Sequence, residues 1–429
     1  MSTPLTGVAN LPFVPGPTPP MIVRGEGNHL ITDTGKRILD AGGGAIVTNI
    51  GHGRREVAEA AARSMTDVGY VIPPWATPDR VALRDRLVTN WLPAGMDRVG
   101  IVSGGSESVD AAIRLAVAHQ RASGRDSKWR IIGRRPSYHG ATIATLSAGG
   151  HDARRSGFDA TLLDYPHAPW NDVDALEQTI SEADPDTIAA FVAEPIIGAA
   201  GAALTPDDDY FTKAADLCAR NDILFIADEV MTGFGRCGSK FGYELFGAQP
   251  DILVGSKGLS GGYAAMGGVY ATQEVVAPLE AANENFMYFT YSGHSAACAV
   301  ANAVLQIMED EKLVERAAVQ GQKLNARLVD EFADHPHVSD IRGRGLLIGL
   351  ELVAERNPHA WFPADAGFKD QVVGQCLERG VWVYPAGSGE VVQDAILLGP
   401  PFTITDDEID QLVAVLRQAI DAAAKDALK

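Results

Sequence analysis

The feature that most constrains the fold is the alternation, through the middle of the chain, of short apolar runs with amphipathic windows. The runs have the length of buried strands, and the windows between most of them carry apolar residues at helical spacing. The strand candidates are 98–102, 130–133, 188–193, 222–227, 252–254 and 266–270, and the helix candidates include 107–121, 174–182 and 207–220. This alternation predicts a mostly parallel sheet covered by helices. Ligands of such sheets bind beyond the carboxyl ends of the strands, so residues that follow the apolar runs are the first site candidates.

The two ends of the chain differ from its middle. Residues 28–39 predict a short antiparallel ribbon, and residues 340–429 mix both patterns, with strands expected at 347–352, 381–384 and 395–399 and helices at 366–379 and 406–424. We expect the two ends to build one smaller α+β domain, connected to the large one by a long helix over 301–333. The predicted domains are an N-terminal arm with part of the small domain (1–64), a large domain (65–325) and the C-terminal part of the small domain (326–429).

Charge and cysteine content narrow the function classes. The 429 residues carry a net charge of -19, which disfavours binding to nucleic acid or an anionic membrane. No apolar window approaches the length of a membrane span, and the first 20 residues lack the basic region and apolar core of a signal peptide. The cysteines at 218, 237, 298 and 376 form no CxxC pair, which argues against disulfides and structural zinc. We expect a cytoplasmic protein without a metal.

Lys257 is the strongest catalytic candidate. It follows the apolar run 252–254 and precedes a glycine-rich stretch, which places a primary amine where a strand ends and a loop begins. A lysine amine becomes a nucleophile toward carbonyl groups once burial lowers its pKa. The rival, Lys240, has no strand before it and is expected to be solvated.

An acid and a phosphate cradle occupy equivalent places. Asp228 ends the apolar run 222–227, where a carboxylate could pair with a protonated pyridine nitrogen, although metal ligation or helix capping is also common for such an aspartate. Glu229 should point to the opposite face and have a structural role. The turn 103–107 opens a helix with small residues whose N–H groups could bind a phosphate. A glycine turn with Ser106 as N-cap explains the same residues.

Two further segments could contact a ligand. Tyr138 could stack on a flat ring, or it could be a core tyrosine beside a turn, and His139 is interpreted as a hydrogen-bonded structural residue. The loop 289–294 is either a ligand loop or the start of a capped helix.

Taken together, these segments resemble the class III pyridoxal-phosphate-dependent aminotransferases, and the resemblance runs along nearly the whole chain. The matching segments occur in the order found in that family: Leu39–Gly43, Ile50–Gly53, Ser106–Ala112, Tyr138–Thr142, Ala193–Ile196, Ala227–Val230, Gly233–Arg236, Pro250–Ile252, Lys257–Gly262, Thr290–His294, Arg342–Leu346 and Pro400–Pro401. The fold implied is α/β of the aspartate-aminotransferase type, with a mostly parallel seven-stranded sheet in the large domain and a smaller α+β domain from both termini.

The resemblance also implies roles for single residues. Lys257 would form the Schiff base with pyridoxal 5'-phosphate and shuttle the proton, and Asp228 would pair with the pyridinium. The other implied cofactor-binding residues are Val230 and Tyr138 on the two ring faces, Gly105 and Ser106 at the phosphate, His139 beside them, and Thr290 reaching the phosphate of the neighbouring subunit. A homodimer would then be the minimum catalytic unit, and dimers could pair into tetramers.

Departures from the family pattern bear on the substrate. Members that handle ornithine, acetylornithine or 4-aminobutyrate carry an arginine where this chain has Ala141 and another where it has Leu397, so the usual partner of Glu194 is missing. Those substrates are disfavoured, and the pattern resembles the omega-amine and beta-amino-acid members. Glu194, Trp75, Tyr165 and Tyr291 are the substrate-pocket candidates.

The leading hypothesis is a ping-pong aminotransferase that moves an amino group from an amine donor to an oxo-acid acceptor, pyruvate or 2-oxoglutarate. An aminomutase, racemase or decarboxylase on the same scaffold is the alternative, and it would need no separate oxo-acid acceptor. A non-enzymatic scaffold protein ranks last because both Lys257 and Asp228 are present.

Overall fold

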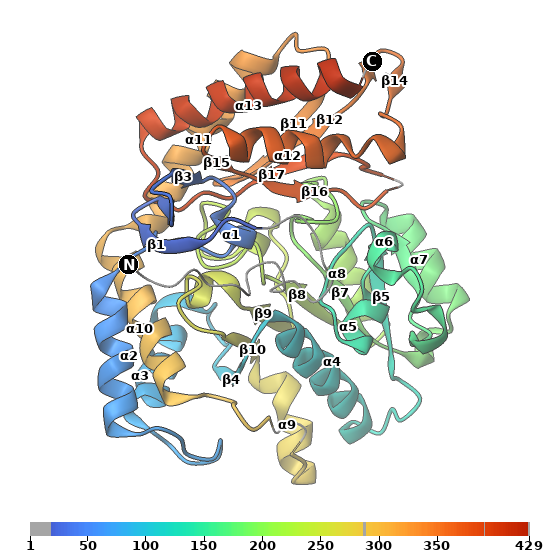
Figure 1. The fold of residues 1–429 in the computed structure, drawn as a ribbon. Coiled ribbons are helices and arrows are strands. Elements are labelled where there is room, and N and C mark those ends of the chain that lie inside the picture. The colour runs from blue at the N-terminus through green and yellow to red at the C-terminus, as the bar shows by residue number, and fades with distance from the viewer. Residues whose placement is uncertain (1–18, 286–288, 390, 428–429) are drawn as a thin grey trace.

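A seven-stranded sheet forms the centre of the computed structural model, which describes residues 19–285, 289–389 and 391–427 (Figure 1). The strand order is β4 (Arg98–Val102), β10 (Gly267–Ala271), β9 (Ile252–Gly255), β8 (Leu224–Asp228), β7 (Ile188–Ala193), β5 (Arg130–Arg135) and β6 (His167–Pro169). Strand β10 is antiparallel to both of its neighbours, and β9, β8, β7, β5 and β6 are parallel to one another. The predicted parallel sheet is confirmed. Strand β6 was not predicted, because so short a segment carries no readable period.

Helices cover both faces of this sheet. Helix α4 (Gly105–Ala122) packs on one face, while α7 (Val173–Glu182) and α8 (Tyr210–Arg220) pack on the other. Neighbouring residues of β7 show the division, since Phe191 stacks on Phe225 at 5.9 Å between ring centroids and Val192 joins the cluster around Val109 of α4. Every residue of β7 is buried, which explains why its sequence is a continuous apolar run.

The two ends of the chain form the smaller layer. The N-terminal ribbon of β1 (Ile22–Glu26), β2 (His29–Thr32) and β3 (Arg37–Asp40) is extended by β15 (Val381–Trp382), which runs parallel to β3. A second sheet has the order β11 (Val338–Arg344), β12 (Leu347–Leu352), β17 (Ala395–Leu398) and β16 (Tyr384–Ala386). Helices α12 (Phe368–Glu378) and α13 (Asp406–Ala427) pack on each other beside these sheets (Figure 1). The smaller α+β part is confirmed, and the domain boundaries at 64/65 and 325/326 stay predictions.

The long helix expected over 301–333 is wrong as a single element. The structure has α10 (Ser295–Asp310) and α11 (Leu313–Phe332), separated by a turn in which Lys312 adopts φ of 51°. Apolar residues are buried on both sides of the turn, Met308 before it and Leu313 after it. The apolar pattern therefore continues through the break, and no proline or glycine marks it.

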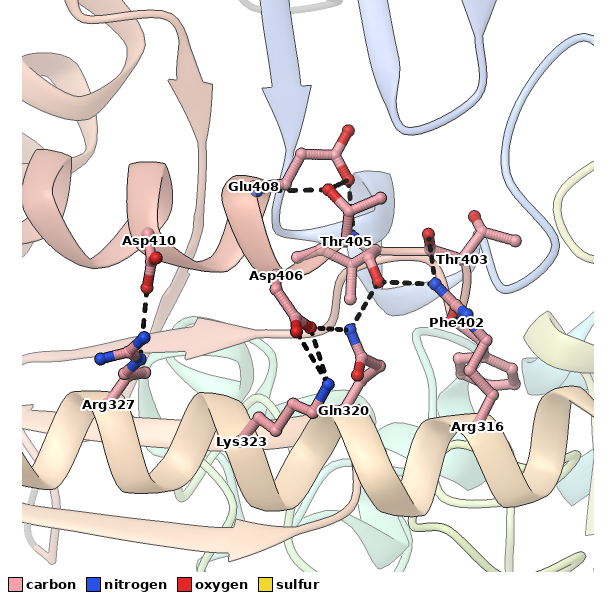
Figure 2. A network of polar contacts seen from close by, with 11 residues as sticks. Arg316, Gln320, Lys323, Arg327, Phe402, Thr403, Thr405, Asp406, Glu408 and Asp410 are labelled. Atoms are coloured by element: carbon pink, nitrogen blue, oxygen red, sulfur yellow. Dashed lines mark hydrogen bonds and ion pairs between the residues drawn. The ribbon is translucent and has the colours of Figure 1, made fainter.

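Polar contacts join α11 to the start of α13 (Figure 2). The Asp406 carboxylate accepts hydrogen bonds from Lys323 Nζ, at 2.9 Å to each oxygen, and from Gln320 Nε2 at 3.0 Å. Arg316 Nε donates to the carbonyl oxygen of Phe402 at 2.9 Å. These bonds hold the segment that connects β17 to α13 against α11.

The remaining elements are short or peripheral. They are α1 (Gly43–Ile46), α2 (Arg55–Asp67), α3 (Pro78–Arg86), α5 (Ile143–Ala148), α6 (Asp152–Arg155), α9 (Gln273–Ala282), β13 (Glu355–Arg356), β14 (His359–Ala360), a π-helical turn (Leu87–Trp91) and 3-10 turns at Asp159–Thr161, Pro185–Thr187, Gly242–Phe246, Lys257–Leu259 and Ala364–Ala366. Among the described residues, no helix is long and apolar enough to cross a membrane, and no group of three histidine, cysteine or acidic side chains could hold a metal ion. The four cysteines are buried and free.

Candidate active site

The sequence-predicted catalytic candidates meet at one edge of the central sheet. Because β10 is antiparallel to both β4 and β9, β4 runs in the same direction as the parallel strands. The carboxyl ends of β4, β5, β7, β8 and β9 therefore share an edge. The segments that leave this edge carry Ser106, Tyr138, Glu194, Asp228 and Lys257.

Asp228 is buried at the end of β8 and is held by two donors. Its Oδ2 lies 2.7 Å from Nδ1 of His139, which is also buried, and its Oδ1 accepts a hydrogen bond from the Val230 amide at 3.1 Å. A carboxylate has about four acceptor positions, so capacity remains for a further N–H donor. His139 Nε2 is buried and has no hydrogen-bond partner among the described residues. His139 therefore has the structural role expected of it: its ring holds the Asp228 carboxylate in place.

Lys257 lies two residues beyond the end of β9, in a turn closed by hydrogen bonds. Its backbone φ is 20°, outside the common regions for a residue with a side chain. The Gly261 amide donates to the Lys257 carbonyl at 3.0 Å, and the adjacent Ser256 hydroxyl donates to the Met266 carbonyl at 2.6 Å. The lysine is enclosed by protein but keeps partial access to solvent. These bonds fix the backbone at the point where the lysine side chain leaves it.

The electrostatic surroundings of Lys257 favour a neutral amine. Burial is the largest effect and lowers the lysine pKa to about 8. The negative charges of Asp228 and Glu194 oppose this change, whereas the positive charges of Arg236 and Arg154 add to it. A pKa near 8 makes the unprotonated, nucleophilic form accessible close to neutral pH.

The start of α4 combines free amides with a closely packed glycine. Helix geometry leaves the first amides of α4, including those of Gly105 and Ser106, without acceptors inside the helix. A Cβ at Gly105 would lie 2.9 Å from Cγ1 of Val230, so the close approach of the two segments requires glycine. Ser106 Oγ accepts a hydrogen bond from the Ala141 amide at 3.1 Å. Gly140 has φ of 142°, and a Cβ there would lie 2.6 Å from Ser106 Oγ.

Tyr138 and Glu194 are joined through the backbone. The Tyr138 amide donates to Glu194 Oε1 at 2.9 Å, and the Gly198 amide donates to Oε2 at 2.9 Å. Burial raises the pKa of the Glu194 carboxyl. Glu194, whose expected arginine partner the sequence lacks, is thus bound by two amides. The guanidinium of Arg154 lies over the Tyr138 ring, 4.5 Å from its centroid.

The positions that lack arginine differ in their surroundings. Ala141 is exposed, so a longer side chain would have room there. Leu397 is fully buried in β17 and packs in the cluster of Phe191 and Leu347. Only the first place could receive a cation without disturbing the core.

Three of the aromatic and threonine candidates lie on the surface. Trp75 and Tyr291 are each 63% exposed, and Thr290 is exposed in the same turn as Tyr291. Tyr70 Oη donates to the Thr290 carbonyl at 2.9 Å. Tyr291 also borders a cavity of about 520 Å³ that reaches Ser103, beside the start of α4.

Tyr165 lies apart from the other candidates. It precedes β6, and the pairing of Gly133 with His167 places it level with the second residue of β5. Its ring centroid lies 6.2 Å from that of Trp129, which immediately precedes β5. Burial raises its pKa to about 12. The structure therefore places Tyr165 toward the opposite end of the strands from Lys257 and gives no support to its place in a substrate pocket.

Glu229 and Arg154 complete the surroundings. Glu229 is buried behind Asp228 and accepts hydrogen bonds from the Thr232 hydroxyl and from the Gly242 and Tyr243 amides, while burial raises its pKa to about 7. This agrees with its expected structural role.

Arg154 was not predicted as a site residue because it stands in a polar stretch next to a second arginine, with no local pattern that separates it from a solvated residue.

Comparisons with known proteins agree with this geometry. The family model described as aminotransferase class-III matches residues 15–420. The chain is 34% identical to the putrescine–pyruvate aminotransferase of Pseudomonas aeruginosa, covering 94% of this chain and 91% of that protein. It is 32% identical to the mitochondrial gamma-aminobutyrate transaminase 1 of Oryza sativa subsp. indica, covering 94% and 81%. A solved (S)-enantioselective omega-transaminase from Thermomicrobium roseum superposes with a TM-score of 0.88 at 36% identity, covering 96% and 94%.

Proposed function

Because the chain belongs to the class III aminotransferases and is an aminotransferase, we propose that Lys257 holds pyridoxal 5'-phosphate and moves the proton of the reaction. The observation that carries this proposal is an amine with a pKa lowered to about 8 at the same sheet edge as the buried Asp228 carboxylate. The function predicted from the sequence, an aminotransferase, is confirmed by the family.

The residues at this edge fit that cofactor. A phosphate requires several N–H donors and little steric bulk, and the start of α4 supplies both at Gly105. A pyridine nitrogen requires a carboxylate with a free acceptor position, which Asp228 has. An aldehyde requires an amine that can lose its proton, and at this edge Lys257 supplies an amine whose pKa burial lowers to about 8.

When bound, the cofactor supplies an electron sink that lets the substrate carbon lose a proton. Asp228 would keep the pyridine nitrogen protonated, and His139 holds the carboxylate in position for this task. Lys257 Nζ accepts and returns the proton at the substrate carbon. Tyr138 and Val230 would hold the two faces of the ring, and Ser106 would bind the phosphate together with the α4 amides.

We propose that a second copy of this chain completes the site. Thr290 lies on an exposed turn, and its match to the family pattern assigns it to the phosphate of a neighbouring subunit. The exposed Trp75 and Tyr291 would be covered in such a dimer. We further propose a cytoplasmic location.

For the substrates, we propose an amine or an omega- or beta-amino-acid donor and pyruvate as the acceptor, with 2-oxoglutarate as the second choice. The relative from Pseudomonas aeruginosa is named for putrescine and pyruvate, which supports this pair. The rice relative is named for gamma-aminobutyrate. The absence of arginine at Ala141 therefore does not remove 4-aminobutyrate from the donors to be tested.

A panel of donors tests the proposal directly. Alanine, beta-alanine, 4-aminobutyrate, taurine, putrescine and 1-phenylethylamine are each added to the holoenzyme without acceptor, and transfer of the amino group is followed by the change in cofactor absorbance. Lys257→Ala should abolish turnover and the visible absorbance of covalently held cofactor. Lys240→Ala, which changes an exposed lysine, should retain both. Retention of both properties in Lys257→Ala would overturn the assignment, and rearranged or racemised product without acceptor would favour the aminomutase or racemase.

A further inference from the structure

The proposed acceptor requires a cation at the site to bind its carboxylate. An oxo-acid carries a carboxylate directly on its reacting carbonyl carbon, so a cation must lie close to the amine of Lys257 to bind it. The two places where relatives of known pattern carry an arginine hold Ala141 and Leu397. The inference below rests on the proposed function and concerns which residue supplies that cation.

Among the described residues, the positive charges of Arg236 and Arg154 act on Lys257 and lower its pKa. Arg236 is buried and already bonded to the backbone, since it donates to the carbonyl oxygens of Thr48 at 2.9 Å, Leu346 at 3.2 Å and Pro400 at 2.6 Å. Moving its guanidinium toward a substrate would leave buried carbonyl groups without donors, which is costly. Arg236 therefore holds the fold together at this edge.

Arg154, unlike Arg236, is exposed and makes few contacts. Within the part of the chain that the structure describes, its interaction is the stacking of the guanidinium on the Tyr138 ring at 4.5 Å. An exposed cation–π contact is weak, so the guanidinium can leave it at little cost. Its five N–H donors are available for a carboxylate.

The charged neighbours of Arg154 are already paired. Asp152, two residues earlier, accepts from Arg135 at 2.6 Å. Arg155 Nη1 donates to the carbonyl oxygens of Leu146, Ser147 and Gly149, each at 2.8 Å. Asp152 and Arg155, the charged residues that flank Arg154 in α6, thus have partners of their own, and the guanidinium of Arg154 is free to turn.

We propose that Arg154 binds the carboxylate of the oxo-acid acceptor. Its guanidinium would leave the Tyr138 ring and form a bidentate pair of hydrogen bonds with the substrate carboxylate. Tyr138 would pack on the cofactor ring, and the positive charge of Arg154, stacked on Tyr138, already acts on the Lys257 amine. A donor without a carboxylate leaves Arg154 on Tyr138, and the same pocket then accepts an uncharged group. Arg154 is in this way a specificity-determining residue for the acceptor half of the reaction.

The test compares two acceptors that differ in charge. Protein reconstituted with pyridoxamine 5'-phosphate is mixed with pyruvate or with its neutral ester, methyl pyruvate, and the rate of cofactor conversion is measured against acceptor concentration. In Arg154→Met, kcat/KM for pyruvate should fall roughly 10- to 150-fold, the range for a lost hydrogen-bonded charge, mostly through KM, while the value for methyl pyruvate changes by less than about threefold. Arg154→Lys should recover part of the pyruvate rate, because the point charge remains but the fork is lost.

A control variant tests whether the loss of any exposed arginine has the same effect. Arg327→Met removes an equal charge from an exposed pair with Asp410, 3.2 Å away in the smaller layer, and should leave both acceptors unchanged (Figure 2). An unchanged pyruvate rate in Arg154→Met, or equal losses for both acceptors, would overturn the proposal. Failure of the wild-type protein to convert any donor would instead count against the proposed function, because the acceptor comparison does not use the donor step.

Discussion

The carboxyl edge of the central sheet and the exposed surface around Thr290 differ in how far one chain fixes its own side chains. At the edge, Asp228 is held by His139 and by the Val230 amide, and Lys257 projects from a turn closed by backbone bonds. At the surface, Trp75 and Tyr291 are each 63% exposed. We infer that the fold builds the reaction chemistry within one chain, whereas the groups that complete phosphate and substrate binding take their final positions from a second copy or from the substrate itself.

After the complete loss of turnover expected in Lys257→Ala, the largest effect should come from the carboxyl edge of the sheet, in Asp228→Asn. An amide at this position no longer carries the charge that keeps the pyridine nitrogen protonated, although its shape and its bond to His139 can be kept. We expect turnover to fall roughly 100- to 1000-fold, as for other preorganised electrostatic groups, with the bound cofactor retained in the absorbance spectrum. The exposed Asp410→Asn serves as the control. A loss below tenfold, with cofactor bound, would show that the edge does not depend on this charge.

The next effect should come from the close approach of two segments, in Gly105→Ala. The new Cβ would lie 2.9 Å from Val230 Cγ1, so the start of α4 must shift away from the ring face. We expect the affinity for pyridoxal 5'-phosphate to fall about 10- to 100-fold, corresponding to a typical overpacking cost of about 1–3 kcal/mol. Titration of the apoprotein with cofactor measures it. Gly374→Ala, at a site in α12 with open space around the added carbon, should not change the affinity.

The pH dependence of cofactor uptake should distinguish an enclosed amine from a solvated one. Uptake requires the unprotonated form of Lys257, and burial lowers its pKa from 10.5 to about 8. Raising the pH through 8 therefore removes the proton and accelerates uptake, with the rate rising about tenfold between pH 7 and pH 9 and levelling above that range. The growth of visible absorbance after mixing apoprotein with cofactor gives the rate. A midpoint above pH 10 would mean that the amine behaves as a surface lysine.

The sequence predicts residues whose place follows from a local pattern, and it does not predict residues whose place depends on contacts across loops. Lys257 and Asp228 were found because each directly follows an apolar run, so a local pattern places them at the sheet edge. Arg154 gave no signal because its contact with Tyr138 spans a loop, and Tyr165 was misplaced because distance along the chain does not tell which end of a strand a residue adjoins. The turn at Lys312 escaped notice because buried apolar residues continue on both sides of it.

The smallest effect should come from the exposed region, in Thr290→Ala. One hydroxyl bond to a phosphate contributes about 1–2 kcal/mol, so we expect cofactor affinity to fall about 5- to 30-fold. The exposed Thr34→Ala, in the N-terminal ribbon, should leave it unchanged. Mixing Lys257→Ala chains with Thr290→Ala chains then tests whether Thr290 contributes to the site of its own subunit or to that of its neighbour. If it serves the neighbour, a heterodimer of Lys257→Ala and Thr290→Ala chains contains one complete site, with Lys257 from one chain and Thr290 from the other. The mixture should then bind part of its cofactor with wild-type affinity. If Thr290 serves its own chain, no heterodimer contains a complete site, and a mixture that shows only the weakened affinity would remove the second copy from the proposed site.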